Sequence, residues 1–172
     1  MVISCAGDLQ VSHGISLSDS MVRTILDLYQ PEYRFVSKAV LADLSLRCEV
    51  LPARYPYTQT QVFEYVTAPA ATLIVCQLAY VLVGGLIATE NPVVRPCISW
   101  DQFVQLRDAA LLRFTRYEAR FHAEVPNRVP IPCMIAMGKT KHLNSCLHCV
   151  MSFEIGNGIF GEVRSAVVRG TK

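Results

Sequence analysis

The sequence is poor in charge. Only 17% of its 172 residues are charged, the formal net charge is +2, and no block of basic residues occurs along the chain. A nucleic-acid-binding surface needs a basic patch or stripe, so we expect no nucleic-acid partner. The hydrophobic share of 52% is too high for a disordered chain, and the length suits one well-packed domain.

Short motifs of several enzyme classes are also missing. The sequence contains no Gly-x-Ser-x-Gly, no Gly-rich phosphate-binding loop and no dinucleotide-binding fingerprint. Hydrolases with a serine elbow, nucleotide triphosphatases and dinucleotide-dependent dehydrogenases therefore have no support. We expect no cofactor.

The first residues lack the basic and apolar regions of a signal peptide. Seven cysteines are an odd number, which favours free thiols in a reducing compartment over a disulfide framework. We therefore expect a cytoplasmic protein. Cys146 and Cys149 resemble half of a zinc site, but residues three apart on a strand point to opposite faces, so no metal site is expected.

What the sequence does contain is one long uncharged apolar run, residues 68–89. Its length would suffice for a membrane-spanning helix, which needs about 20 apolar residues. Against a span stand Pro69 at one end, Gln77 in the middle and the lack of a flanking Lys/Arg cluster. An all-round apolar helix also suits the core of a globular protein, and we expect that role and no membrane span.

Alternating apolar and polar residues predict β-strands on both sides of this run. The expected strands cover 33–41, 43–50, 114–125, 133–141, 143–155 and 159–168. Short amphipathic helices are expected at 21–28 and 99–112, and Gly156-Asn157-Gly158 suits a hairpin turn. An antiparallel sheet curved around one long central helix is the hot-dog fold, of the α+β class. We expect one hot-dog domain over 17–172, preceded by a loose N-terminal arm over 1–16.

The start of the apolar helix is the first candidate site. Thr67 or Ala68 is the expected cap and Pro69 lies in the first turn, where free backbone N–H groups can polarise a thioester carbonyl. Glu64 lies just upstream and would serve as a general base if desolvated; the alternative is a solvated carboxylate.

Two polar groups fall within the apolar run itself. A buried primary amide without partners costs about 1–3 kcal/mol, so Gln77 either bonds the backbone of a neighbouring element or faces a pocket. Cys76 suits a small core side chain, with no basic neighbour in sequence to lower the pKa of its thiol. His122 falls on the polar side of its expected strand and reads as a surface residue.

Four segments resemble a known family. They are Gln77-Leu78-Ala79-Tyr80, Trp100-Asp101-Gln102-Phe103, Arg116-Tyr117-Glu118-Ala119-Arg120-Phe121 and Gly161-Glu162-Val163-Arg164. In order and spacing they are similar to the FcoT family of hot-dog proteins, described as long-chain acyl thioesterases and as enzymes that add glycine to an enoyl group on acyl carrier protein (ACP). The resemblance covers about residues 22 to 168.

The resemblance implies a hot-dog dimer, either a homodimer or a heterodimer with another hot-dog subunit. It also implies a fatty or polyketide acyl substrate carried on ACP or CoA, and a site beside the central helix. A family tyrosine after the first helix matches Tyr29, and a second one matches Tyr55 or Tyr57. The expected catalytic residues are Thr67, Tyr29, Tyr57 and Glu64. The expected substrate-binding residues are Tyr65, Ala68, Cys76, Gln77 and Tyr80.

Three of these positions depart from the family pattern. Thr67 replaces an asparagine and Tyr65 a histidine of the family's Gly-His-Phe-Asn signature, while Cys76 replaces a second asparagine. Three functions therefore stay open. The first is thioester hydrolysis, with the carbonyl held at the helix start and water positioned by Thr67 and a tyrosine. The second is dehydration or conjugate addition at an enoyl thioester, and the third is a non-catalytic binding subunit of a heterodimer.

Overall fold

The computed structural model describes residues 14–52, 63–94, 96, 98–106, 112–143 and 146–168. Along the chain the helices are α1 (Asp19–Ile25), the 3-10 turns η1 (Leu26–Leu28) and η2 (Pro31–Tyr33), α2 (Ala68–Ala88) and α3 (Trp100–Leu106). The strands are β1 (Ile15–Ser16), β2 (Val36–Ala42), β3 (Ser45–Val50), β4 (Leu112–Phe121), β5 (Ile131–Leu143), β6 (Cys146–Ile155) and β7 (Ile159–Val168).

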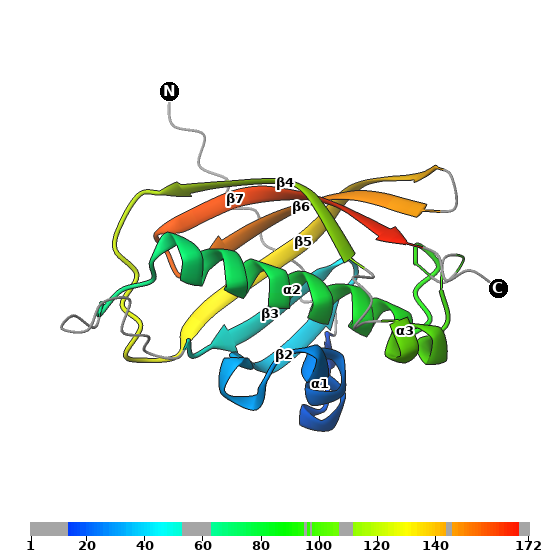
Figure 1. Cartoon of the computed structure of the whole chain (residues 1–172), viewed down its shortest axis with the longest axis horizontal. Coiled ribbons are helices and arrows are strands. Elements are labelled where there is room, and N and C mark those ends of the chain that lie inside the picture. The colour runs from blue at the N-terminus through cyan, green and yellow to red at the C-terminus, as the bar shows by residue number, and fades with distance from the viewer. Residues whose placement is uncertain are drawn as a thin grey trace.

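The described strands form one seven-stranded antiparallel sheet in the order β1-β2-β3-β5-β6-β7-β4. The sheet curves, and α2 lies across one of its faces, while α1 and α3 flank the C-terminal half of α2 (Figure 1). The predicted α+β hot-dog architecture is confirmed. The last two residues of the predicted N-terminal arm, Ile15 and Ser16, form β1 and pair with β2.

Helix α2 is the centre of the core. Thr67 precedes the helix with extended backbone, and Pro69 lies in its first turn, where proline is tolerated. The last helical residue is Ala88, and Thr89 is the C-cap. It is the one helix in the described ranges that is long and apolar enough to cross a membrane, and 78% of its most apolar stretch is buried inside the fold. Its sheet contacts fall mainly on β2, β3, β5 and β6. Most of the apolar surface of α2 is therefore covered by the rest of the fold.

Two adjacent glycines let other elements approach α2 closely. A Cβ atom at Gly84 would lie 2.8 Å from Ile25 Cγ1 and 2.9 Å from Phe103 Cζ. A Cβ atom at Gly85 would lie 2.9 Å from Leu17 Cδ1. The two small residues therefore seat α1 and α3 against the C-terminal half of α2.

The structure corrects several predicted boundaries. The helix expected over 99–112 is described from Trp100 to Leu106, and Leu112 belongs to β4 instead. The strand expected from residue 33 begins at Val36, because Pro31 opens a 3-10 turn in front of it. Leu143 ends β5 instead of opening the next strand. The hairpin turn is confirmed, since Gly156 has a φ of +55° between β6 and β7.

Strand β4 forms one edge of the sheet and is the least covered of the long strands. Tyr117 is 36% exposed and Phe121 is 48% exposed, although both were predicted to face inward. Their strand partners Val163 and Ile159 are buried, so the two aromatic rings lie on the inner face, which α2 covers only in part at this place. This uncovered part of the inner face bears on the candidate site.

We expect Gly84→Ala to destabilise the protein. The added methyl group meets Ile25 and Phe103 in a fully buried contact, and this clash outweighs the roughly 1 kcal/mol gained in helix propensity. The net loss in the free energy of unfolding should be about 1–2 kcal/mol. Gly138→Ala is the matched control, because its Cβ atom would meet only Val150 O, at 3.4 Å. Urea denaturation measures both; a Gly84→Ala protein at least as stable as the wild type would contradict this packing.

Candidate functional site

The start of α2 presents backbone donors. Thr67 is the cap residue, with φ −83° and ψ 166°, and its side chain does not cap the helix. Ala71 N donates to Thr67 O at 2.8 Å, and Pro69 has no N–H. The N–H groups of Ala68 and Ala70 have no hydrogen-bond partner in the described ranges. Two donors at the positive end of a helix dipole thus remain for an acceptor.

A hollow of about 430 Å³ lies at this helix start. Its lining residues are Tyr65, Val66, Ala68, Phe121, His122, Ala123 and Glu124. They come from the segment before α2 and from the end of β4 and the loop that follows. The predicted residues Tyr65 and Ala68 are therefore brought together, beside a strand that lies more than fifty positions later in the chain.

Backbone and amide hydrogen bonds fix the segment that leads into α2. Val66 N donates to Val125 O at 2.8 Å, and Asn127 N donates to Glu64 O at 3.0 Å. The Asn127 amide also donates to Phe63 O at 3.0 Å and to Tyr65 O at 3.3 Å. Asn127 is 8% exposed. Its role was not predicted from the sequence, because its amide bonds two residues that lie 64 and 62 positions earlier in the chain, and such a long-range contact leaves no periodic signal.

Thr72, Cys76 and Tyr80 continue the site along α2 at spacings of four residues, which places successive side chains on neighbouring turns. The Tyr29 ring meets the Tyr80 ring edge-on, with centroids 6.4 Å apart. Tyr117 of β4 shares a hydrogen bond with Thr72 and stacks on Phe153 at 5.7 Å. Tyr29, Cys76 and Tyr80, three of the predicted residues, therefore cluster.

We call the surface formed by Ala68, Thr72 and Cys76 of α2 and by Tyr117 and Phe121 of β4 the α2–β4 seam. Phe121 lines the hollow with Ala68, and Tyr117 bonds Thr72 one helical turn further on. The inner face of β4 thus follows α2 from its start toward Cys76. From Ala68 to Tyr80 the helix rises about 18 Å, a length that can accommodate an extended apolar chain.

The ionisable groups of this cluster are held neutral. Burial raises the pKa of Tyr29 well above its usual range, and the nearby Cys76 and Tyr80 add to that shift. Burial raises the pKa of Cys76 to about 11. Burial also raises the pKa of Tyr117, which the Thr72 hydrogen bond partly offsets. At neutral pH these side chains are hydrogen-bond donors and not bases.

Glu64 does not meet the condition set for a general base. Its side chain is 62% exposed and forms an ion pair with Arg128. A carboxylate needs desolvation to become a base near neutral pH, and this one lies in solvent beside a cation. The structure therefore supports the alternative prediction of a solvated carboxylate.

Gln77 has a structural role. It is fully buried, its Oε1 accepts from Phe35 N at 2.9 Å, and its Nε2 donates to Tyr33 O at 2.5 Å. Of the two predicted alternatives, the structure shows the bond to a neighbouring backbone, so we remove Gln77 from the expected substrate-binding set. The amide fixes the segment after η2 to the middle of α2.

The remaining candidates do not belong to the seam or lie outside the described residues. Tyr55 and Tyr57 belong to the second group. His122 follows β4 and is exposed; it lines the hollow at the helix start, and its ring packs edge-on against Phe160. Cys149 is buried and shares a hydrogen bond with Ser165, and the described ranges hold no group of three or more potential metal ligands.

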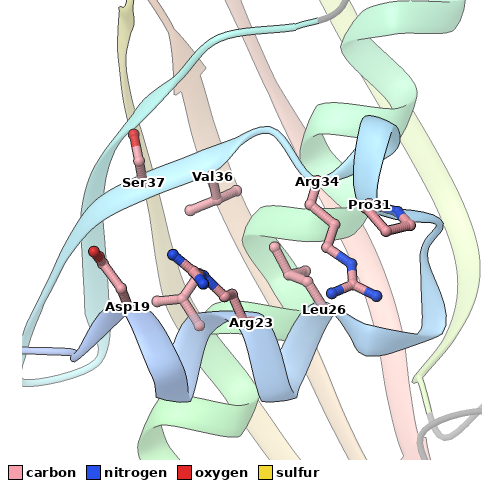
Figure 2. Close-up of a pocket in the computed structure, with 8 residues that line it drawn as sticks. Asp19, Arg23, Leu26, Pro31, Arg34, Val36 and Ser37 are labelled. Carbon is pink, nitrogen blue, oxygen red and sulfur yellow. The ribbon is translucent and has the colours of Figure 1, made fainter.

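A second hollow of about 460 Å³ lies between α1 and the start of β2, and the seam residues do not line it (Figure 2). Its lining residues are Asp19, Val22, Arg23, Leu26, Pro31, Arg34, Val36 and Ser37. No residue in this set was predicted to be functional.

Comparison with known proteins supports the fold alone. No protein-family model and no curated protein match the chain, so membership of the FcoT family stays a prediction. Among solved structures, the chain is similar to a crystal structure of an inactive His-to-Phe mutant of CurJ dehydratase in complex with a compound. The TM-score is 0.51 at 10% sequence identity, over 88% of this chain. This chain spans 48%, about half, of that one. The fold is thus that of a hot-dog dehydratase.

We expect the Cys76 thiol to react slowly with iodoacetamide. With a pKa of about 11 in place of 9.0, its thiolate fraction at pH 8 is about a hundredfold lower than that of an ordinary thiol, and its rate should still rise above pH 10. Peptide-level mass spectrometry measures the rate, and an unstructured peptide of residues 70–82 is the matched control. A rate profile that coincides with the peptide's would contradict the buried position of Cys76.

Proposed function

We propose that this protein binds a fatty or polyketide acyl thioester, carried on ACP or CoA, at the α2–β4 seam and hydrolyses it. The observation that carries the proposal is the pair of unpartnered N–H groups, of Ala68 and Ala70, at a hollow that continues along an apolar seam. Donors aimed at a carbonyl oxygen stabilise the negative charge that develops there when water attacks.

In this proposal, some residues of the site bind the acyl chain and others take part in the chemistry. Phe121, Tyr117 and the α2 side chains between them offer apolar surface to the acyl chain. The neutral hydroxyl groups of Tyr29 and Tyr117 suit hydrogen bonds to a polar substituent or to water, and in this proposal the hydroxyl group of Thr67, the cap residue of α2, orients the attacking water. Glu64 is left out of the mechanism, because it lies in solvent.

A lyase reaction on the same class of substrate is the second candidate, favoured by the structural likeness to CurJ dehydratase. The mutant of that protein is inactive with a phenylalanine in place of a histidine. In the present chain the histidines in the described ranges, His122, His142 and His148, are all exposed. Of these, His122 lines the hollow at the start of α2, so a lyase reaction there would depend on that histidine. We place hydrolysis first because the N–H groups at the helix start can hold a thioester carbonyl without a histidine.

The third candidate is a binding subunit that a second hot-dog chain completes. The neutral state of Tyr29, Cys76 and Tyr117 favours it, because no described seam residue is a base at neutral pH. The same observation suits hydrolysis only if water attacks with the help of hydrogen-bond donors alone. Activity measured with and without a partner separates the two.

We further propose that the protein forms a dimer through β4. This ten-residue strand ends the sheet, so one side of its backbone is open to another strand, and its inner face exposes Tyr117 and Phe121. The chain also accounts for about half of the CurJ dehydratase chain that it matches. A second subunit would cover the seam from its open side.

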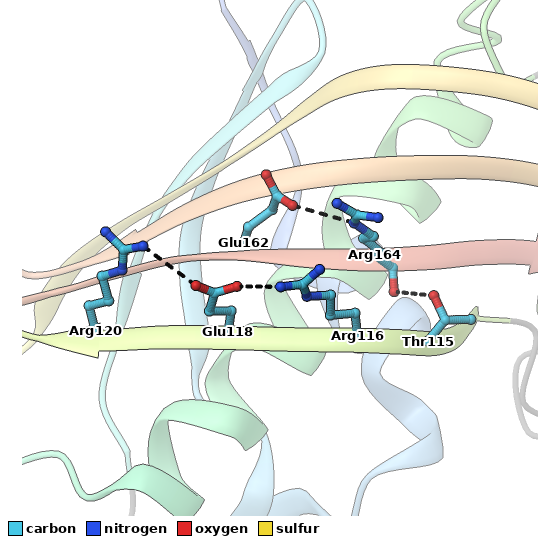
Figure 3. Close-up of polar contacts among 6 residues, drawn as sticks. All are labelled: Thr115, Arg116, Glu118, Arg120, Glu162 and Arg164. Atoms are coloured by element: carbon cyan, nitrogen blue, oxygen red, sulfur yellow. Dashed lines mark hydrogen bonds and ion pairs between the residues drawn. The ribbon is translucent and has the colours of Figure 1, made fainter.

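The charges of β4 favour one register for such pairing. Arg116 and Arg120 each form an ion pair with Glu118, at 3.1 Å and 3.5 Å (Figure 3). The side-chain charges along the outer face of the strand are therefore positive, negative and positive in turn. If two copies pair antiparallel about Ala119, Glu118 of each lies opposite Arg120 of the other. Tyr117 and Phe121 then form two aromatic pairs on the inner face. Pairing about Glu118 would instead put like charges opposite each other.

The proposed activity is tested with panels of acyl-CoA and acyl-ACP substrates. Hydrolysis releases the carrier thiol, whereas a lyase changes the mass of the acyl group with the carrier still attached. We expect Ala68→Pro to lower kcat by about 10²–10³ through loss of one donor. The fold should persist, because Thr67 already has the extended backbone that precedes a proline.

The matched control is Pro69→Ala, which adds an N–H group to the same turn and should keep full activity. Full activity of Ala68→Pro would contradict a carbonyl held at the helix start. No turnover of the wild type unless a hot-dog partner is added would support the binding-subunit alternative over hydrolysis by this chain alone.

The dimer register is tested by charge exchange. Arg120→Glu would put a carboxylate opposite Glu118 of the second copy at two symmetric places, and should raise the dimer Kd roughly ten- to hundredfold. The double variant Glu118→Arg/Arg120→Glu should restore it. Glu162→Gln, on the same face but one strand inward, is the control. Analytical ultracentrifugation measures all four proteins; a wild type that stays monomeric at micromolar concentration would refute the interface.

A further inference from the structure

We propose that the hollow between α1 and β2 binds an oxyanion, such as a phosphate monoester or a carboxylate, that is attached to a short apolar body. The hollow is separate from the α2–β4 seam, so this inference does not depend on the proposed function. It rests on two arginines that flank an apolar floor (Figure 2).

Arg34 is held in place before any ligand arrives. Its Nε donates to Tyr29 O at 2.8 Å, and its Nη2 donates to Asp27 Oδ1 at 2.7 Å. The side chain is only 22% exposed. A guanidinium has five N–H donors, and these bonds leave both N–H groups of Nη1 available. A guanidinium held in place by these bonds can present its Nη1 donors to an oxyanion.

Arg23 supplies the second positive charge. It lies on the exposed side of α1, and no ion pair or hydrogen bond joins it to another residue of the described ranges. Figure 2 shows Arg23 and Arg34 on either side of Leu26, from two different elements. An exposed arginine without a carboxylate partner, beside a half-buried one, leaves positive potential at the mouth of the hollow.

Two carboxylates accompany the two arginines, and one of them belongs to the lining set. Asp27 is bonded to the Nη2 side of Arg34, and Asp19 is the one carboxylate that lines the hollow. Lys38, next to the lining residue Ser37, is paired with Glu49. The lining set therefore carries two positive charges and one negative charge, with the Ser37 hydroxyl as a further polar group.

The floor of the hollow determines what the anion is attached to. Val22, Leu26 and Val36 line it and are each at most 8% exposed. A volume of about 460 Å³ exceeds what a bare phosphate would fill and lies in the range of small-ligand sites. An anion that also carries a few methylene groups would fill more of the space than an inorganic ion.

The test is isothermal titration calorimetry on the full chain at low ionic strength, with three probes: inorganic phosphate, hexyl phosphate and hexanoate. We expect hexyl phosphate to bind more tightly than inorganic phosphate, because the hexyl chain covers the apolar floor. Binding of hexanoate in place of hexyl phosphate would identify a carboxylate as the preferred oxyanion. No heat from any probe at millimolar concentration, beyond a chloride control, would overturn the proposal.

Variants locate the binding. Arg23→Gln should weaken the tightest probe by about tenfold or more, through loss of one charge-assisted hydrogen bond. Because Arg34→Gln also removes the bonds to Asp27 and Tyr29, Arg34→Lys is used beside it, and thermal unfolding checks that both fold. Arg47→Gln, an exposed arginine on β3, is the matched control. Unchanged affinity in Arg23→Gln would place the bound anion elsewhere.

Discussion

Burial of one apolar helix against one curved sheet is the constraint on which the rest of this structure depends. Helix α2 has no charged residue from Ala68 to Ala88, so every side of it must find apolar cover. Strands β2, β3, β5 and β6 supply most of that cover, and α1 and α3 close over Gly84. Gln77 is an uncharged polar side chain buried in the middle of this helix. Its amide oxygen and its amide nitrogen each form a hydrogen bond with the backbone.

The same constraint explains where a site is available. At the edge of the sheet, β4 runs beside the N-terminal half of α2, and its inner face keeps two partly exposed aromatic rings. Helix and strand then enclose a seam whose polar groups are phenols, a thiol and a hydroxyl, all neutral at physiological pH. Such a seam favours an uncharged, elongated ligand over a charged one, and its backbone donors lie at one end.

Much of this arrangement could be predicted from local patterns. Residues 68–89 are apolar without a break, and Thr67 with Pro69 mark the helix start, so α2 was placed to within one residue. Period-two alternation located β3, β6 and β7, since each has one buried face. The end of α3 was missed because the amphipathic pattern continues past Leu106 into β4. The exposure of Tyr117 was missed because alternation shows which face a residue takes but not whether another element covers that face.

The candidate site was predicted only in part, for a similar reason. Tyr29, Cys76 and Tyr80 meet where the chain between η1 and β2 lies against α2, and Gln77 bonds that part of the chain at Phe35 and Tyr33, 42 and 44 positions upstream. Glu64 was predicted to be a base only if desolvated, and only the fold shows that its side chain is exposed and paired with Arg128. Pairings over such distances depend on how the sheet closes, which no local pattern contains.

The position of α2 in the chain has a consequence for synthesis on the ribosome. The helix is complete at Ala88, while its partner β5 ends at Leu143. At a synthesis rate of about 5–20 residues per second, roughly 3–10 s therefore pass between completion of this apolar segment and completion of β5. During that interval its described contact partners upstream, α1, η1, β2 and β3, are already synthesised, whereas β5 and β6 are not. Until the second half of the sheet has emerged, an apolar stretch as long as a membrane-spanning helix therefore has only part of its final cover.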